Sequence, residues 1–331
     1  MKGTLDRRTF SQLLAMSLAA TATSAVPAWA QAPFPAKPVR IVVPFPPGGP
    51  TDVLARVLAQ RLGDSLGQQF IVDNRPGATG TIATAQVAKA TADGYTLLMH
   101  ATSSHVSAYL YRKVGYDPMK DFAPVANAGS LHFYLVTHPS LPVKAVKDIV
   151  ALAKRRPGEL AFSSPGSGSG GHLVMGMFMA ATGIKLLHVP YKGAAPSIAD
   201  LIAGQVSLTF DTISTSHPHV KNGRLRGIAV SGAKRAAAAP EIPTVMESGV
   251  PGFETYIWFG LFAPAGTPGA AVNRLNGEVN KVIAAPDYQQ RITGTLGGEA
   301  APNTPEQFAE FLRSDTPKWI KVIQDTGARV E

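Results

Sequence analysis

The sequence predicts an α/β fold with two domains, each a mixed sheet flanked by helices, and three observations support this prediction. Short apolar runs alternate with stretches whose apolar residues recur at helical spacing, as in strands that alternate with covering helices. This alternation restarts after residues 137–139. Beyond residue 262 only helical segments follow, and these must find a sheet to cover. We therefore expect the chain to cross twice between one domain of residues 31–137 with 257–331 and another of residues 138–256.

The first domain is expected to begin with a strand at residues 39–43 and a helix that opens near Pro50. Arg56, Arg61 and Asp64 lie off the apolar face of this helix, which indicates a surface helix with one buried stripe formed by Val53, Leu54, Val57, Leu58 and Leu62. The elements that follow are a strand at 70–72, a turn at 75–80, a helix at 82–90 and a strand at 95–99.

The second domain repeats this alternation after an apolar run at residues 133–136. Helices are expected at residues 144–156, 172–181 and 197–203, and strands at 160–163, 188–190, 206–210 and 226–230. A buried strand at 256–262 and three helical segments that end near Gln324 would then return the chain to the first domain.

The N-terminus has the features of an export signal. Lys2, Arg7 and Arg8 precede a modest apolar run at residues 13–25, and a small-x-small site ends at Ala30. Residues 6–10 resemble a twin-arginine signal, with a general secretory signal as the open alternative, and both routes lead to the periplasm. The short run disfavours a retained membrane anchor. We expect cleavage after Ala30.

Composition excludes several classes of function. The chain has no cysteine, which excludes thiol catalysis, thiolate metal sites and disulfides. Its formal net charge is +9, of which the expected signal contributes two charges. The basic residues are scattered and are not interleaved with aromatic residues, so we expect no nucleic-acid partner. The remaining positive charge indicates either a solvated basic surface or a field that gathers small anions.

Three loops rich in small polar residues each connect a strand to a helix, at residues 45–52, 102–105 and 163–172. Gly48 and Gly49 would let the backbone approach a ligand closely, and the free amides of the following helix favour an anion. Taken alone, the loop at 45–52 is equally consistent with a plain connection. Three such loops from two domains predict a cleft that binds a small carboxylate.

Signals for catalysis and metal binding are weak. The stretch 166–171 contains a literal G-x-G-x-x-G, but the acidic residue of a dinucleotide site is missing about twenty positions later. No G-x-S-x-G nucleophile elbow supports a serine hydrolase. His217-Pro218-His219 is expected to form a loop rather than half of a metal site. We therefore predict no catalytic residues, no metal and no cofactor.

Several single residues remain open to two interpretations. Asp211 ends an apolar strand. It is expected either to accept a hydrogen bond from a donor group on the ligand or to hold a bound water, and the alternative is a role as a helix cap. His105 and His172 each begin a helix after a polar loop, which places them near the cleft. Phe45 and Trp258 are candidates for an apolar ligand wall, although core or hinge positions are the favoured interpretation.

A series of motifs in one order resembles the Bug-type solute-binding proteins of the tripartite tricarboxylate transporter family. The resemblance runs from about Val39 to the C-terminus, and its motifs stand at residues 44–52, 74–77, 93–97, 116–118 with 121–122, 163–173, 189–193, 210–211 and 264–268. It implies a two-domain periplasmic binding protein of the Venus-flytrap, type II-like kind, without catalysis. It also implies capture of an organic acid for delivery to the membrane subunits of such a transporter. We expect a monomer.

The resemblance also implies a site. In this family the ligand carboxylate is held largely by main-chain groups and waters, and these roles carry over to Gly48, Gly49, Ser164, Gly168 and Ser169. The full set of expected substrate-binding residues is Phe45, Pro47, Gly48, Gly49, Asp52, Ser103, Ser104, His105, Ser163, Ser164, Gly168, Ser169, His172, Tyr191 and Asp211. Departures from the family pattern at residues 77–81 and at Val106-Ser107 leave the other end of the ligand open among citrate-like, dicarboxylate, amino-acid and aromatic acids. An exported α/β hydrolase that uses a serine of the loop at 163–172 is the competing hypothesis.

Overall fold

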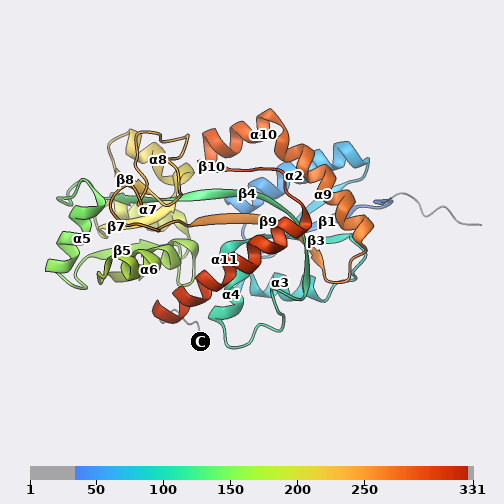
Figure 1. Ribbon diagram of the computed structural model, residues 1–331, viewed down its shortest axis with the longest axis horizontal. Coiled ribbons are helices and arrows are strands. Elements are labelled where there is room, and N and C mark those ends of the chain that lie inside the picture. Colours follow the sequence, from blue (N-terminus) through green and yellow to red (C-terminus); the bar gives the residue numbers. More distant parts are fainter. Residues whose placement is uncertain (1–33, 327–331) are drawn as a thin grey trace, which may run out of the picture. The chain divides into compact units, whose positions relative to one another are not determined.

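A ten-stranded mixed sheet runs through residues 34–326, the part of the chain that the computed structural model describes (Figure 1). Strands β2 (Phe70–Asn74), β1 (Val39–Val43) and β3 (Thr96–Ala101) lie parallel in this order. Strand β9 (Tyr256–Pro264) lies antiparallel to β3, and the first part of β4 (Phe122–Thr137) lies antiparallel to β9. These five strands form the first half of the sheet.

The second half of the sheet begins where β4 changes partners. From Phe133 onward, β4 pairs antiparallel with β7 (Leu208–Thr212) and with β8 (Arg226–Val230). Strand β5 (Ala161–Ser164) is parallel to β7, and β6 (Leu187–Pro190) is parallel to β5. The short strand β10 (Gly298–Glu299) pairs with the middle of β4. Because β4 belongs to both halves, it connects them directly, as its length in Figure 1 illustrates.

Helices flank both halves of the sheet, which confirms the predicted fold class. The helices that contact the first half are α2 (Pro50–Leu66), α3 (Thr81–Ala88), α4 (Thr102–Leu110), α9 (Gly269–Ala284), α10 (Pro286–Gln290) and α11 (Pro305–Thr326), with the 3₁₀-helix η1 (Ala78–Gly80) and the π-helix η2 (Arg291–Leu296). The helices of the second half are α5 (Val146–Arg155), α6 (Gly170–Thr182), α7 (Ala194–Ile202) and α8 (Ile213–Lys221).

Helix α2 shows how the sequence produces such an element. Leu54, Leu58 and Leu62 recur at a spacing of four and are buried, so that one stripe of the helix packs onto the sheet. Gly67 ends the helix at φ 67° in the left-handed region, where glycine carries no steric penalty, and its amide donates to the carbonyl of Gly63. This helix therefore begins and ends where the sequence places its signals.

Helix α11 packs against both halves of the sheet. Near its start, Phe308 and Leu312 join a buried cluster with Trp258 and Phe262 of β9. Further along the helix, Trp319 joins the cluster that fills the second half. The C-terminal helices were expected to return to the first half, and α11 also extends beyond it. Among the described residues, 37–326 form one compact unit.

Local predictions differ from the structure in three places, and one of them is the short strand β10, which lies in a region expected to hold only helices. Residues 217–219 lie inside α8 rather than in a loop, because Ile213, Ser216 and His217 form a buried face of that helix. The apolar run at 133–136 is the end of the 16-residue strand β4, which accommodates Pro124 beside a shift in its register with β9.

The expected export signal and its cleavage after Ala30 lie outside the described residues. Within residues 34–326, no helix has the length and apolar character needed to cross a membrane.

Candidate functional site

A cavity of about 350 Å³ lies where the two halves of the sheet meet. Its walls come from the loop before α2, from the loop before α6, and from the ends of β7 and β9. The lining residues are Phe45, Pro46, Pro47, Gly49, Pro50, Thr51, Ala101, Ser103, Phe133, Pro165, Ser169, Gly170, Gly171, Ala194, Phe210, Asp211, Thr212, Thr215, Ile257 and Phe259. We call this cavity the central pocket.

Five helices begin at the central pocket. The residues that cap α2, α4, α6 and α8 at their N-termini, which are Gly49, Ala101, Ser169 and Thr212, all line it. Ala194, the first residue of α7, lines it as well. The first amides of each helix have no partner within the helix, and the helix dipole places partial positive charge there. The pocket is therefore suited to an anion, although its lining, as far as the structure describes it, includes no cationic side chain.

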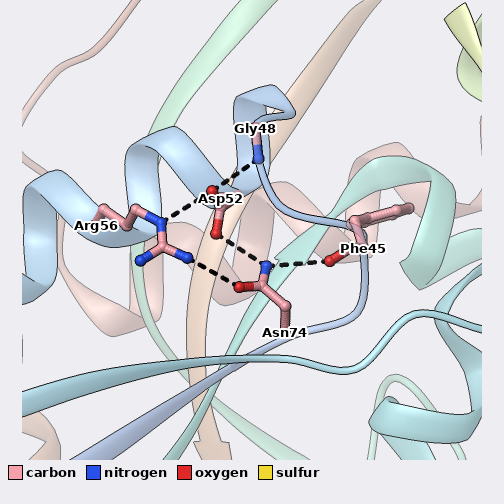
Figure 2. A network of polar contacts seen from close by, with 5 residues as sticks. All are labelled: Phe45, Gly48, Asp52, Arg56 and Asn74. Atoms are coloured by element: carbon pink, nitrogen blue, oxygen red, sulfur yellow. Dashed lines mark hydrogen bonds and ion pairs between the residues drawn. The ribbon is translucent and has the colours of Figure 1, made fainter.

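Asp52 holds the loop that precedes α2, as Figure 2 shows. Its Oδ2 accepts hydrogen bonds from the amide of Gly48 at 2.9 Å and from Nε of Arg56 at 3.0 Å. Its Oδ1 accepts from Nδ2 of Asn74 at 2.9 Å, and the same Nδ2 donates to the carbonyl of Phe45 at 3.1 Å. The Asp52 side chain faces this network, so it shapes the loop and does not line the pocket.

The charge of Asp52 is stabilised inside this network. Burial by itself raises the pKa of the carboxyl, but the hydrogen bonds from Arg56, Gly48 and Asn74 and the charge of Arg56 bring the pKa below its ordinary value. The backbone of Gly48 adopts φ 89°, a conformation that glycine tolerates and that directs its amide to Asp52. Asp52 is therefore ionised at neutral pH and can accept the hydrogen bonds from Gly48, Arg56 and Asn74 together.

The Ser/Gly loop before α6 is held in a similar way by two histidines. His172 Nδ1 accepts a hydrogen bond from the amide of Gly168 at 3.0 Å, and Ser164 Oγ lies 2.7 Å from Nε2 of His188. The two imidazole rings stack with their centroids 3.9 Å apart and their planes 6° apart. Burial lowers the pKa of His172 to about 4, with a further contribution from His188, and burial also lowers the pKa of His188. Both rings are therefore neutral at pH 7.

The helix start after this loop requires glycine because other groups approach it closely. A Cβ on Gly171 would lie 2.5 Å from the carbonyl oxygen of Phe210, and a Cβ on Gly170 would lie 2.7 Å from the ring of Phe133. Both glycines line the central pocket. The main chain of α6 thus reaches the pocket without an intervening side chain.

Asp211 lies at the end of β7 and lines the central pocket. Ser216 Oγ donates a hydrogen bond to its Oδ2 at 2.7 Å. Burial raises the pKa of Asp211 to about 6, although the hydrogen bonds from Ser216 and from the amide of Thr212 act in the opposite direction. This carboxyl therefore titrates close to neutral pH.

The other walls of the pocket are apolar. They consist mainly of aromatic rings, prolines and one isoleucine: Phe45, Pro46, Pro47, Phe133, Pro165, Phe210, Ile257 and Phe259. Successive residues of a strand point to opposite faces, so Ile257 and Phe259 face the pocket while Trp258 faces the core. Trp258 donates through Nε1 to Asp315 Oδ2 at 3.0 Å, which agrees with the core interpretation of this residue.

The expected site residues fall into three groups. Phe45, Pro47, Gly49, Ser103, Ser169 and Asp211 line the central pocket. Gly48, Asp52, Ser164, Gly168 and His172 do not line it but hold the loops that do.

The other four expected residues hydrogen-bond elsewhere. Ser104 bonds to the main chain of Ala101, Ser163 to the carbonyl of Ser197, and Tyr191 to Asp200. His105 is buried against α11, where its Nε2 lies 3.0 Å from Oγ1 of Thr316.

Sequence reasoning did not assign roles to Arg56, Asn74, His188 or Ile257. Arg56 stands four residues after Asp52 on the same helix, a spacing that brings the two side chains together and was visible in the sequence. The partners of Asn74 and His188 come from distant parts of the chain, and no local signal identifies them.

Comparisons with known proteins place this geometry among transport receptors. A family model described as "Tripartite tricarboxylate transporter family receptor" matches residues 54–328. The chain is 40% identical over 291 residues to a UPF0065 protein in the tcbD-tcbE intergenic region of Pseudomonas sp. strain P51, covering 88% of this chain and 86% of that protein. It is 37% identical over 314 residues to protein BugT of Bordetella pertussis, covering 94% and 96%.

Solved structures show the same fold. The chain is similar to R. palustris Rpa4515 with adipate, with a TM-score of 0.81 and 39% identity over 90% of this chain and 100% of that one. It is also similar to MatC (Rpa3494) from Rhodopseudomonas palustris with bound malate, with a TM-score of 0.77 and 31% identity over 88% of this chain and 100% of that one. Both similar proteins carry small dicarboxylic acids.

Proposed function

The chain belongs to the tripartite tricarboxylate transporter family of receptors, and we propose that its central pocket captures a small organic acid. It is a Bug-type solute-binding protein and not an enzyme, since the family and the fold are those of receptors. The competing hypothesis of an exported hydrolase finds no support in the family or in the similar structures.

The convergence of five helix N-termini on one pocket carries this proposal. One helix end stabilises an anion by about 0.3–2 kcal/mol. Micromolar binding requires about 8 kcal/mol in total. Several helix ends must therefore act on the carboxylate together, with bridging waters and burial of the rest of the ligand supplying the remainder.

The apolar walls indicate an acid with a hydrocarbon body. Each methylene group that leaves water for such a wall contributes about 0.8 kcal/mol. A short dicarboxylate or an aromatic acid has such a body and would meet Phe133, Ile257 and Phe259. A citrate-like tricarboxylate would bring three charges to a pocket that has no lysine or arginine in its described lining. We propose the first two classes over the third.

Closure of two domains around the ligand belongs to the same proposal. The change of partners along β4 supports a boundary near residue 137, and the position of β9 supports a second boundary near residue 257. We propose that domains of residues 31–137 with 257–331 and of residues 138–256 close on the acid.

We further propose how the receptor is used in the cell. A signal cleaved after Ala30 would direct export by the twin-arginine or the general secretory pathway. The mature receptor would then be a monomer in the periplasm, where it passes the acid to the membrane subunits of its transporter. The export features of the sequence and the family membership support this step.

A thermal-shift panel of mature protein with adipate, malate, citrate, benzoate and glutamate tests the proposal. A ligand present at about one hundred times its dissociation constant adds about 2.7 kcal/mol to the free energy of unfolding. We expect adipate or benzoate to raise the melting temperature more than citrate does. The absence of any shift with every carboxylate would contradict the proposed function.

A further inference from the structure

Asp211 is the single titratable side chain in the described lining of the central pocket. It is buried, and its Oδ2 already accepts a hydrogen bond from Ser216. The lining contributes no lysine, arginine or histidine that would neutralise it. The pocket therefore combines a preference for anions, which arises from the helix ends, with one acidic group of its own.

The groups packed around Asp211 do not supply a counter-charge at neutral pH. Tyr134 of β4 stands opposite Asp211 in the ladder with β7, and His217 of α8 lies 6.1 Å from Tyr134 between ring centroids. Burial raises the pKa of Tyr134. Burial and the charge of Lys221 lower the pKa of His217, whereas the charge of Glu241 raises it. Both rings are therefore neutral near pH 7. The facing residues of α6 and β9 are glycines and apolar side chains.

We propose that a carboxylate ligand enters the central pocket together with one proton, which is held on Asp211. This inference rests on the proposed function of the pocket. A cavity of about 350 Å³ brings a ligand carboxylate and an ionised Asp211 into the same small space. Their repulsion favours the protonated form of Asp211 in the complex. The neutral carboxyl then donates a hydrogen bond where the charged one would repel.

The proton comes from the solvent and binds the Asp211 oxygen that Ser216 does not occupy. It returns to the solvent when the acid leaves, so that binding and release balance in protons and in charge. Burial raises the pKa of Asp211 to about 6 before any ligand is present, which makes this group the one closest to uptake at pH 7. His172, with a pKa of about 4, stays neutral in this range.

The ligand's own charge decides whether the proton is needed. An acid without an amino group, such as adipate or benzoate, would bind with proton uptake. An amino acid such as glutamate would place its ammonium group against ionised Asp211 and bind without it. Asp211 thus acts as a specificity-determining residue that separates these two classes of ligand.

Isothermal titration calorimetry of the mature protein with adipate and benzoate tests this inference. Titrations at pH 7 in buffers of different ionisation enthalpy give the number of protons taken up for each ligand bound. We expect a value approaching one, and an affinity that falls by up to about tenfold for each pH unit between pH 7 and pH 9. Binding of either acid without proton uptake and with an affinity independent of pH would overturn the inference.

Two variants locate the proton. Asp211→Asn keeps the size of the side chain and a hydrogen-bond donor, so it should bind adipate without proton uptake and without the dependence on pH. Asp315→Asn is the matched control, because burial also raises the pKa of Asp315, which lies outside the pocket and bonds Trp258 and Trp319. It should behave as the wild type does. Unchanged uptake in Asp211→Asn would overturn the assignment to this residue.

Failure of this inference is distinguishable from failure of the proposed function. If adipate and benzoate bind without proton uptake, the proposed receptor function is supported and the proposed role of Asp211 is wrong. If no carboxylate binds in either the calorimeter or the thermal-shift panel, the proposed function falls, and the role of Asp211 falls with it.

Discussion

Gly49 lines the central pocket at the start of α2, and a side chain added there would project into open space. Its φ of −78° is accessible to any residue. We therefore expect Gly49→Val to fill part of the pocket and lower ligand affinity at least tenfold. The lost N-cap preference should cost only about 1 kcal/mol of folding stability. Calorimetric titration with adipate, together with thermal unfolding, measures both effects.

Gly269→Val is a matched control, because Gly269 also stands at a helix start with open space around its Cβ, but it lies outside the pocket lining. It should bind ligand as the wild type does. An unchanged affinity in Gly49→Val would show that the loop before α2 takes no part in binding.

Asp52 is the residue that holds the same loop from inside. Asp52→Asn would place an amide group among donors from Gly48, Arg56 and Asn74, so at least one donor would lose its acceptor. We expect a loss of about 1–3 kcal/mol of folding stability together with weaker binding. Chemical denaturation measures the first effect and titration the second.

An exposed acidic residue provides the comparison for Asp52. Asp287→Asn removes a carboxylate that pairs with Arg61 on the surface, where an ion pair contributes about 0–1 kcal/mol. If both variants lost the same stability, the Asp52 network would have no special role in holding the loop.

At the residue scale, the sequence predicted the loops well and the side-chain directions poorly. Gly49 and Ser169 were identified because turn glycines and helix caps are local signals. Ser104 and His105 were placed near the pocket for the same reason, but neither side chain lines it, and their hydrogen bonds go to Ala101 and Thr316. Which way a side chain points depends on contacts with distant elements, and these leave no local pattern.

Among the elements, the Ser/Gly loop and α6 depend on His172 and His188 remaining neutral. Burial lowers the pKa of both rings below the value that each has in the unfolded chain. The stability that they contribute is therefore fully present above about pH 6.5 and is lost as the pH falls toward the folded value, about 4 for His172. Thermal unfolding between pH 8 and pH 4.5 should show this loss.

His172→Asn tests the assignment, because the Asn side-chain oxygen can accept the bond from Gly168 while the titrating group is removed. We expect a smaller decrease in melting temperature on acidification than in the wild type. His219→Asn changes a histidine of α8 that lies outside this stack and should leave the decrease unchanged. An identical acid response in His172→Asn would contradict the role of the stacked pair.

Element types were predictable where periodicity was strong, as for α2 and β1. The sequence did not predict that α8 extends through Pro218, because a proline in a short polar segment favours a loop. Nor did it predict the length of β4, whose first part contains Pro124 and is made regular by pairing with β9. In both cases packing with another element overrides the local preference.

For the whole molecule, α11 joins the two halves of the sheet through Phe308 at one end and Trp319 at the other. We therefore expect a single cooperative unfolding transition, with equal calorimetric and van't Hoff enthalpies, rather than separate transitions of two domains. Differential scanning calorimetry of the mature protein measures this directly.

Trp319→Ala should weaken this connection. Trp319 is buried, and its removal should cost about 3–5 kcal/mol and broaden or divide the transition. Phe311→Ala, on a partly exposed position of the same helix, should cost less and preserve one transition. A single sharp transition in Trp319→Ala would show that α11 is not what couples the halves.

The return of the C-terminal helices was predicted because only helical segments were expected after residue 262, but neither the short strand β10 nor the reach of α11 across both halves was predicted. The contact of His105 with Thr316 joins positions 211 residues apart, and that of Ser65 with Glu278 joins positions 213 residues apart. Such pairs result from the whole topology and not from any window of sequence.

The source of positive charge in the central pocket has an evolutionary consequence. Under the proposed function, the charge that meets the acid is the partial positive charge of the helix-end amides that open on the described lining. A point mutation to any residue except proline changes a side chain but leaves the amide N–H in place. Under the proposed function, affinity for a carboxylate persists as long as the loops keep their conformation, whereas substitutions of wall residues such as Ile257 and Phe259 change the rest of the site. Duplicated copies of such a gene can acquire new acids as cargo by exchanging a few neutral side chains.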